Sequence, residues 1–205
     1  MARSERLSSF GQSDSASVVD RFGVWLSARA LRREVGSFSG KRLGDFGCGY
    51  HATFARSVLD DVASAVLVDV ALADDLKADR RVTAIEGQLP DAVAGIPDRS
   101  LDVALCISVL EHLWDPLVML RELRRLTAEG GVCLLNVPTW RGKRFLEFSA
   151  YRLGLSPREE MDDHKHYYDP RDLWPLLVAA GFVPHAITCY RHKFGLNTFA
   201  ACRVD

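Results

Sequence analysis

Short apolar runs alternate with helix-like segments through the first two thirds of this chain, and this alternation limits the fold more than any other feature. We expect strands at residues 42–46, 65–70, 82–86, 101–107 and 132–137. Runs that are apolar along most of their length indicate strands buried on both faces, with the intervening helices as cover. The pattern therefore predicts an α/β fold built on a doubly wound, mainly parallel sheet.

The last third of the chain departs from this alternation. The expected elements are, in order, a helix at 141–155, a charged loop at 157–169, a helix at 170–180 and strands at 182–190 and 194–203. The two strands predict an antiparallel C-terminal hairpin at one edge of the sheet. Pro175 lies inside the expected helix, so this helix either kinks there or begins later.

The chain of 205 residues suits a single domain, which we place at residues 16–205 behind a flexible, serine-rich tail at 1–15. Within it, residues 16–40 are expected to form an N-terminal cap helix. The helix and loop at 141–168 are expected on the substrate side.

A net charge of −1 argues against nucleic acid as a partner. Five cysteines without a Cys-x-x-Cys pair, and no long uninterrupted apolar stretch, favour a cytoplasmic protein without stable membrane insertion. The oligomeric state is left open.

A glycine-rich segment follows the first expected strand. Asp45 is followed by Gly47, Cys48 and Gly49, and Asp69 ends the second expected strand. Glycines let backbone approach a ligand closely, and a carboxylate after the second strand can accept hydrogen bonds from ribose hydroxyls. Together these residues predict a site for a nucleoside-bearing cofactor.

Two cofactors fit the spacing. Gly47, Gly49 and Ala52 formally match the fingerprint of a dinucleotide site, with Asp69 at the expected distance. However, Asp45 would repel a pyrophosphate, whereas it would attract the ammonium and sulfonium groups of S-adenosylmethionine. The charge pattern favours the methyl donor over a nicotinamide cofactor.

The order of motifs resembles the class I S-adenosylmethionine-dependent methyltransferases. The resemblance rests on the runs at 43–49, 100–103, 108–116, 121–126, 129–132 and 136–138. The run Glu-His-Leu-x-Asp-Pro at 111–116 is similar to the branch that acts on small molecules, lipids and sugars. The resemblance implies that Asp45, Gly47 and Gly49 line the methionine end, that Gln88 and Leu89 face the adenine, and that Ser108 lies near the transferred methyl group.

Two positions depart from the family pattern. His51 replaces the third glycine, which bears on how tightly the following helix packs. Gln88 stands where the family often has aspartate, although an amide can still accept from the adenine amino group and donate to a ring nitrogen. We expect the cofactor to bind despite both changes.

The loop at 157–169 is either solvated or a cover for the methyl acceptor. In the second case His164 or His166 is the candidate general base, because imidazole titrates near neutral pH. We expect no metal site from Asp162, Asp163, His164 and His166, because neither aspartate has a fixed place beside the histidines. His112 is expected to be structural.

The predicted activity is methyl transfer to an oxygen or nitrogen of a small molecule, with a sugar, a lipid or a secondary metabolite as candidate acceptors. Two alternatives stay open: a nicotinamide-dependent oxidoreductase or epimerase, and a non-catalytic cofactor-binding partner protein.

Overall fold

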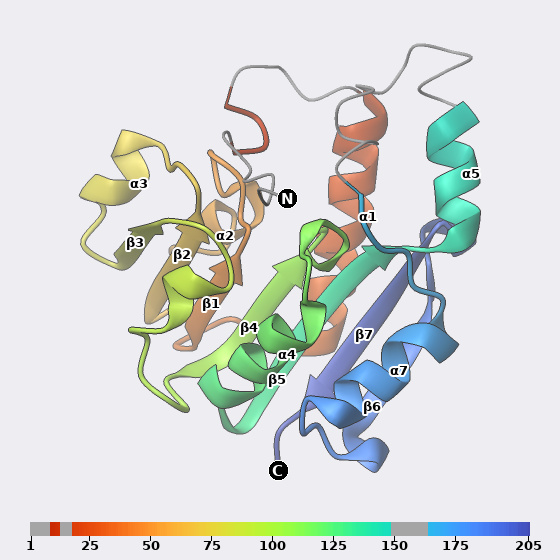
Figure 1. Cartoon of the computed structure of the whole chain (residues 1–205). Coiled ribbons are helices and arrows are strands. Elements are labelled where there is room, and N and C mark those ends of the chain that lie inside the picture. Colours follow the sequence, from red (N-terminus) through yellow and green to blue (C-terminus); the bar gives the residue numbers. More distant parts are fainter. Residues whose placement is uncertain (1–8, 13–17, 149–163) are drawn as a thin grey trace.

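The computed structural model describes residues 9–12, 18–148 and 164–205 (Figure 1). Its centre is a seven-stranded sheet in the order β3-β2-β1-β4-β5-β7-β6. The strands are β1 (Arg42–Phe46), β2 (Ser64–Asp69), β3 (Val82–Glu86), β4 (Leu101–Ile107), β5 (Thr127–Pro138), β6 (Ile187–His192) and β7 (Asn197–Arg203). Strands β1 to β5 pair in parallel, and β7 is antiparallel to both β5 and β6. The predicted fold class, with its C-terminal hairpin, is confirmed.

Helices cover both faces of the sheet. They are α1 (Val18–Val35), α2 (Thr53–Arg56), α3 (Asp74–Ala78), α4 (Pro116–Leu126), α5 (Trp140–Phe148) and α7 (Pro170–Ala179). One buried cluster joins α1, α2 and α3 to one face, and a second joins α4 and α7 to the other. Because each strand sends alternate side chains to opposite faces, apolar runs along the strands supply both clusters.

Most strand boundaries agree with the sequence, and the helix ends differ more. Helix α2 starts only at Thr53, since Ala52 before it adopts a left-handed conformation (φ 42°). Helix α4 is capped by Asp115, whose side chain accepts from the Leu117 N–H. It ends at Leu126, because β5 begins at the next residue.

The C-terminal elements are shorter than expected. Helix α7 starts at Pro170, so a later start is excluded, and it continues through Pro175. Strand β6 begins at Ile187 because a short 3-10 turn occupies Pro184–Ala186. A second such turn at Lys193–Gly195 delays β7 to Asn197.

Candidate functional site

A cleft of about 500 Å³ lies at the carboxyl ends of β1, β2 and β4. Asp45 of β1, Asp69 of β2 and Ile107 of β4 line it, together with residues of α1 and of the loops above the sheet. Ligands of open α/β sheets bind at this edge, where parallel strands end and loops diverge. We therefore expect a cofactor to bind in this cleft.

The predicted glycine loop forms the floor of the cleft. Gly47 and Gly49 both have φ of 75°, a conformation that side-chain-bearing residues seldom adopt. A Cβ on Gly47 would lie 2.3 Å from Val109 Cγ2, and one on Gly49 would lie 3.2 Å from the Phe10 carbonyl oxygen. The loop therefore needs glycine for its own packing as well as for any ligand.

Asp45 and Asp69 face the same cleft, as the charge argument requires. Asp45 is only 5% exposed. Burial, and then the nearby charge of Asp69, raise the pKa of the Asp45 carboxyl to about 7. A carboxylate buried beside another acid gains stability from a cationic ligand and would repel a phosphate. This observation fits the amino group of a methyl donor and does not fit a dinucleotide.

The Asp69 carboxylate is held by neighbouring donors. One oxygen accepts from the Gly49 N–H (2.8 Å), and the other accepts from the Val70 N–H (2.8 Å) and from Ser9 Oγ (2.5 Å). A carboxylate oxygen has two lone pairs, so capacity for a further donor remains. The Ser9 hydroxyl thus contacts Asp69 in the way that a ribose hydroxyl would.

Ser9 belongs to a short turn that packs against the glycine loop. The Tyr50 N–H donates to the Phe10 carbonyl oxygen (2.9 Å), and Phe10 lines the cleft. The sequence places residues 1–15 in a flexible tail; in its described part, residues 9–12, Phe10 lines the cleft and Ser9 contacts Asp69. A serine-rich composition carries no signal of this contact.

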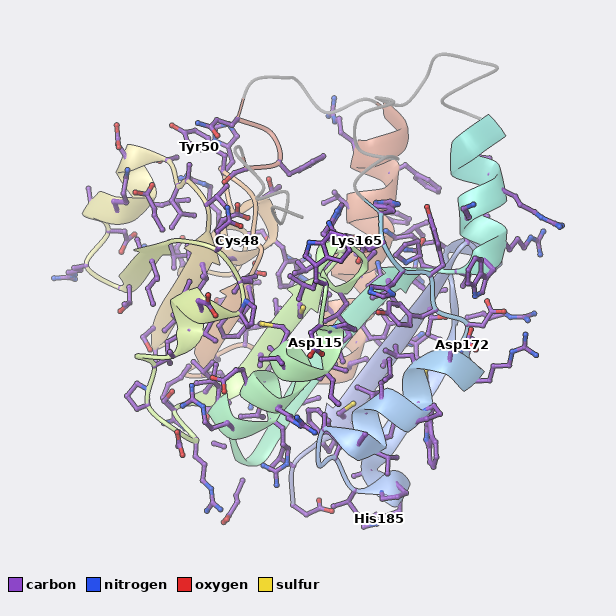
Figure 2. All side chains as sticks on the ribbon, in the orientation of Figure 1. Cys48, Tyr50, Asp115, Lys165, Asp172 and His185 are labelled. Atoms are coloured by element: carbon purple, nitrogen blue, oxygen red, sulfur yellow. The ribbon has the colours of Figure 1, made fainter. Side chains whose placement is uncertain are left out.

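Cys48 lies in the loop without the properties of a nucleophile. Burial, together with the charges of Asp45 and Asp69, raises the pKa of its thiol well above the ordinary value. The protonated thiol is a weak nucleophile. Cys48 therefore contributes shape and backbone to the cleft (Figure 2).

The remaining predicted cofactor residues divide into two groups. Ser108 lines the cleft; its φ is 57°, and its N–H donates to the Asn136 carbonyl oxygen (2.7 Å). Such backbone strain in a non-glycine residue is common at functional sites. Gln88 and Leu89 follow β3 as expected, but they are not among the residues that line the cleft. Their assignment to the adenine remains a prediction.

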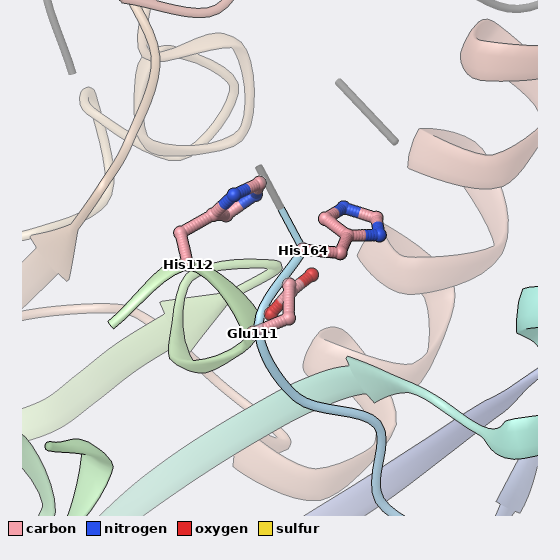
Figure 3. Close-up of side chains that lie close together, drawn as sticks. All are labelled: Glu111, His112 and His164. Atoms are coloured by element: carbon pink, nitrogen blue, oxygen red, sulfur yellow. The ribbon is translucent and has the colours of Figure 1, made fainter. Parts of the chain in front are cut away.

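Three side chains that line the cleft lie close together (Figure 3). Glu111 and His112 belong to a 3-10 turn, Leu110–His112, that follows β4, and His164 belongs to the segment that leads into α7. One ligand-capable atom from each of the three lies within 4.8 Å of the others. Glu111 is buried, whereas both histidines are half-buried. Sequence reasoning gives Glu111 and His112 only structural roles, because their distance from His164 in the chain hides the contact.

His166 takes a different position from His164. It is half-buried and does not line the cleft, and its ring lies 5.9 Å from the ring of Tyr168. The N–H groups of Lys165 and His166 both donate to the Glu111 carbonyl oxygen, at 2.7 and 3.2 Å. The segment is thereby fixed to the turn after β4. Asp162 and Asp163 lie outside the described residues.

Much of the remaining lining of the cleft is apolar. Phe22 and Leu26 of α1, Phe145 of α5, and Phe194 and Leu196 near the C-terminal hairpin line it. The amphipathic pattern of α1 predicts a helix but not that its apolar residues face a ligand space. An acceptor with a substantial apolar surface would be accommodated here.

Comparison with known proteins identifies the family. A model of the methyltransferase domain matches residues 20–187, which is most of the chain. The chain belongs to the methyltransferase-domain family. A probable S-adenosylmethionine-dependent methyltransferase of Mycobacterium tuberculosis is 28% identical over 146 residues, covering 69% of this chain and 48% of that protein. The ubiquinone biosynthesis O-methyltransferase of Bordetella pertussis is 28% identical over 169 residues, covering 75% of this chain and 67% of that protein.

Solved structures show the same fold. A SAM-dependent methyltransferase from Archaeoglobus fulgidus matches with a TM-score of 0.62 at 14% identity, covering 87% of this chain and 93% of that one. The family match agrees with the sequence prediction of a methyltransferase, and the mycobacterial relative is itself named as S-adenosylmethionine-dependent. This methyltransferase-domain chain spans about half the length of the mycobacterial relative. Among the helices of the described residues, none is both long and apolar enough to cross a bilayer.

Proposed function

We propose that this methyltransferase-domain chain transfers a methyl group from S-adenosylmethionine to an oxygen or nitrogen atom of a small molecule with an apolar body. The observation that carries the proposal is the buried, cleft-facing Asp45 carboxylate beside the glycine loop. Burial without a cationic ligand is unfavourable for this charge, so the site favours a ligand that brings a positive group.

The residues of the cleft suit the parts of this cofactor. When bound, S-adenosylmethionine supplies an electrophilic methyl group on a positively charged sulfur. Asp45 would hold the amino group, the loop from Gly47 to Gly49 would follow the methionine end, and Asp69 would accept hydrogen bonds from the ribose. Ser108 would lie near the methyl group. Each of these residues lines the cleft.

The acceptor would bind beside the apolar residues of the cleft, between α1 and the turn at Lys193–Gly195. There the His164 side chain would lie near the acceptor proton. Of the two histidines predicted as the base, His164 is the one that lines the cleft, so we propose it for this role. His166 would then act by positioning the segment that carries His164. Most of the rate enhancement would come from placement of the acceptor and exclusion of water, because the methyl group is already reactive.

The Bordetella relative is named for O-methylation in ubiquinone biosynthesis, which supports oxygen as the acceptor atom. Its name also fits an acceptor with an apolar body, and the aromatic residues Phe22, Phe145 and Phe194 support the same class.

Calorimetric titration separates this function from the nicotinamide alternative. The full chain is expected to bind S-adenosylhomocysteine and not NAD; binding of NAD alone would reject the proposal. Transfer of a tritiated methyl group into a panel of phenols and hydroxylated lipids then tests activity, and transfer to none of them alongside firm S-adenosylhomocysteine binding would favour the non-catalytic binding protein.

A matched pair of variants tests the ribose assignment. Asp69→Ala is expected to lose S-adenosylhomocysteine binding. Asp60→Ala, which removes a side chain that is 96% exposed and lies outside the cleft, is expected to bind like the wild type. Equal affinities for the two variants would contradict the role given to Asp69.

A further inference from the structure

Glu111, His112 and His164 form a set of side chains that methyl transfer by placement alone does not require. They are the only described group of three or more potential metal ligands that lie this close together. Two imidazoles and one carboxylate form a ligand set that suits first-row divalent metals. We infer that these three residues bind a divalent transition-metal ion at the acceptor side of the cleft. The inference concerns metal binding and does not depend on the proposed methyl transfer.

The spacing of the rings fits one shared ion. The centroids of the His112 and His164 rings lie 4.8 Å apart, with an interplanar angle of 62°. Two imidazoles bound to one zinc ion at tetrahedral angles have ring centroids about 5 Å apart, given a Zn–N distance of about 2.0 Å. The two rings are therefore already at the separation that binding needs.

Binding would draw the ligand atoms together by up to about 1.5 Å. They lie within 4.8 Å of one another, and two ligands of a tetrahedral zinc ion are separated by about 3.3 Å. Side-chain rotation of the half-buried histidines can supply this movement. Glu111 is the buried member of the three and would bind the ion from the protein interior.

A neighbouring hydroxyl can orient one of the histidines. Tyr167 Oη lies 3.3 Å from His164 Nδ1. Metal-bound histidines usually hold their second ring nitrogen by such a contact, which fixes the tautomer and leaves the other nitrogen for the metal. With Nδ1 facing Tyr167, Nε2 of His164 is the nitrogen available to the ion.

The position of the cluster predicts what the ion does. All three residues line the cleft, so the ion would have protein on one side and at least one coordination position open to the cleft. One carboxylate and two neutral imidazoles leave a net charge of +1 on a divalent ion. An acceptor that presents an oxygen would bind there as an oxyanion, and its proton would leave to solvent. The ion, in place of the His164 imidazole, would then activate that oxygen.

The test is zinc binding to the full chain. Chelator-treated protein is titrated with Zn²⁺ by calorimetry, and with Co²⁺ by visible absorption, which reports coordination geometry. We expect one ion per chain with micromolar affinity or tighter. His112→Gln and His164→Gln are each expected to weaken binding at least tenfold, the lower end of effects seen when metal sites are disturbed.

His185→Gln is the matched control. His185 pairs with Asp205 and lies at the lower edge of the molecule in Figure 2, away from Lys165, the neighbour of His164; its loss is expected to leave zinc affinity unchanged. Far-ultraviolet circular dichroism confirms that each variant folds. If wild-type, His112→Gln and His164→Gln proteins bind zinc equally, or if the wild type binds none, the inference is overturned.

A separate titration with S-adenosylhomocysteine keeps the two proposals apart. Nucleoside binding without zinc binding overturns only the metal site. Zinc binding without nucleoside binding overturns only the proposed methyl transfer.

Discussion

Replacement of Asp45 by asparagine provides the sharpest test of the reasoning about the cleft. Burial first, and the charge of Asp69 second, raise the pKa of this carboxyl from 3.8 to about 7. In the unfolded chain the group titrates near its ordinary value. The folded state therefore binds this proton more tightly than the unfolded state does.

The sign of the effect follows from linkage. The stabilising contribution of protonated Asp45 is fully present below about pH 4 and is lost as the pH rises through about 7. The rise in the pKa of Asp45 from 3.8 to about 7 corresponds to about 4 kcal/mol of folding stability in all. Of this, about 3 kcal/mol is lost between pH 5 and pH 8.

An asparagine side chain does not titrate, so the Asp45→Asn variant should escape this loss. Thermal unfolding of the ligand-free protein at pH 5 and pH 8 measures the difference. The melting temperature of the variant, relative to the wild type, should rise by roughly 5–10 °C between the two pH values. Burying the asparagine amide costs the same free energy at both pH values, so comparing the two pH values removes this cost from the result.

The same substitution should weaken the cofactor site. Loss of a charged hydrogen bond to the ligand amino group predicts about 10- to 100-fold weaker S-adenosylhomocysteine binding. In the wild type, affinity should fall by up to about tenfold per pH unit below 7, because the ammonium prefers the ionised carboxylate.

Asp102→Asn serves as a control. Asp102 pairs with Arg42 at the amino end of β4, and hydrogen bonding to Arg42 lowers the pKa of its carboxyl. Its stabilising contribution is lost only as the pH falls through that lowered pKa, so it should show no comparable change between pH 5 and pH 8. If Asp45→Asn and the wild type share one pH dependence of stability, the argument from burial is refuted.

Two further substitutions probe the walls of the cleft. Gly47→Ala places a Cβ against Val109 in a left-handed backbone and should lower the free energy of unfolding by about 2–3 kcal/mol, as measured by urea unfolding. Gly95→Ala, which has open space around it, should change this free energy little. Equal stabilities of the two variants would contradict the packing argument. Ser9→Ala removes the hydroxyl that contacts Asp69 and should tighten S-adenosylhomocysteine binding about two- to tenfold by calorimetry. Weaker binding would mean that Ser9 supports the site instead of competing for it.

The sequence by itself determined the sheet and several of the residues that line the cleft at its edge. The strand run 101–107 matches the structure, because a nearly continuous apolar stretch has few other ways to be buried. The place of Asp45, Gly47 and Asp69 in one cleft was predictable because they lie at the carboxyl ends of parallel strands, and these ends meet at one edge of the sheet.

Only the tertiary structure decided the rest of the site. His164 lies more than 50 positions from His112 in the chain, and Ser9 lies 60 from Asp69, yet each pair is in contact. Periodicity and capping describe neighbours along the chain, whereas these contacts depend on how whole loops pack above the sheet. The pKa of Asp45 has the same origin, because the burial that raises it exists only once the sheet and its covering loops have assembled.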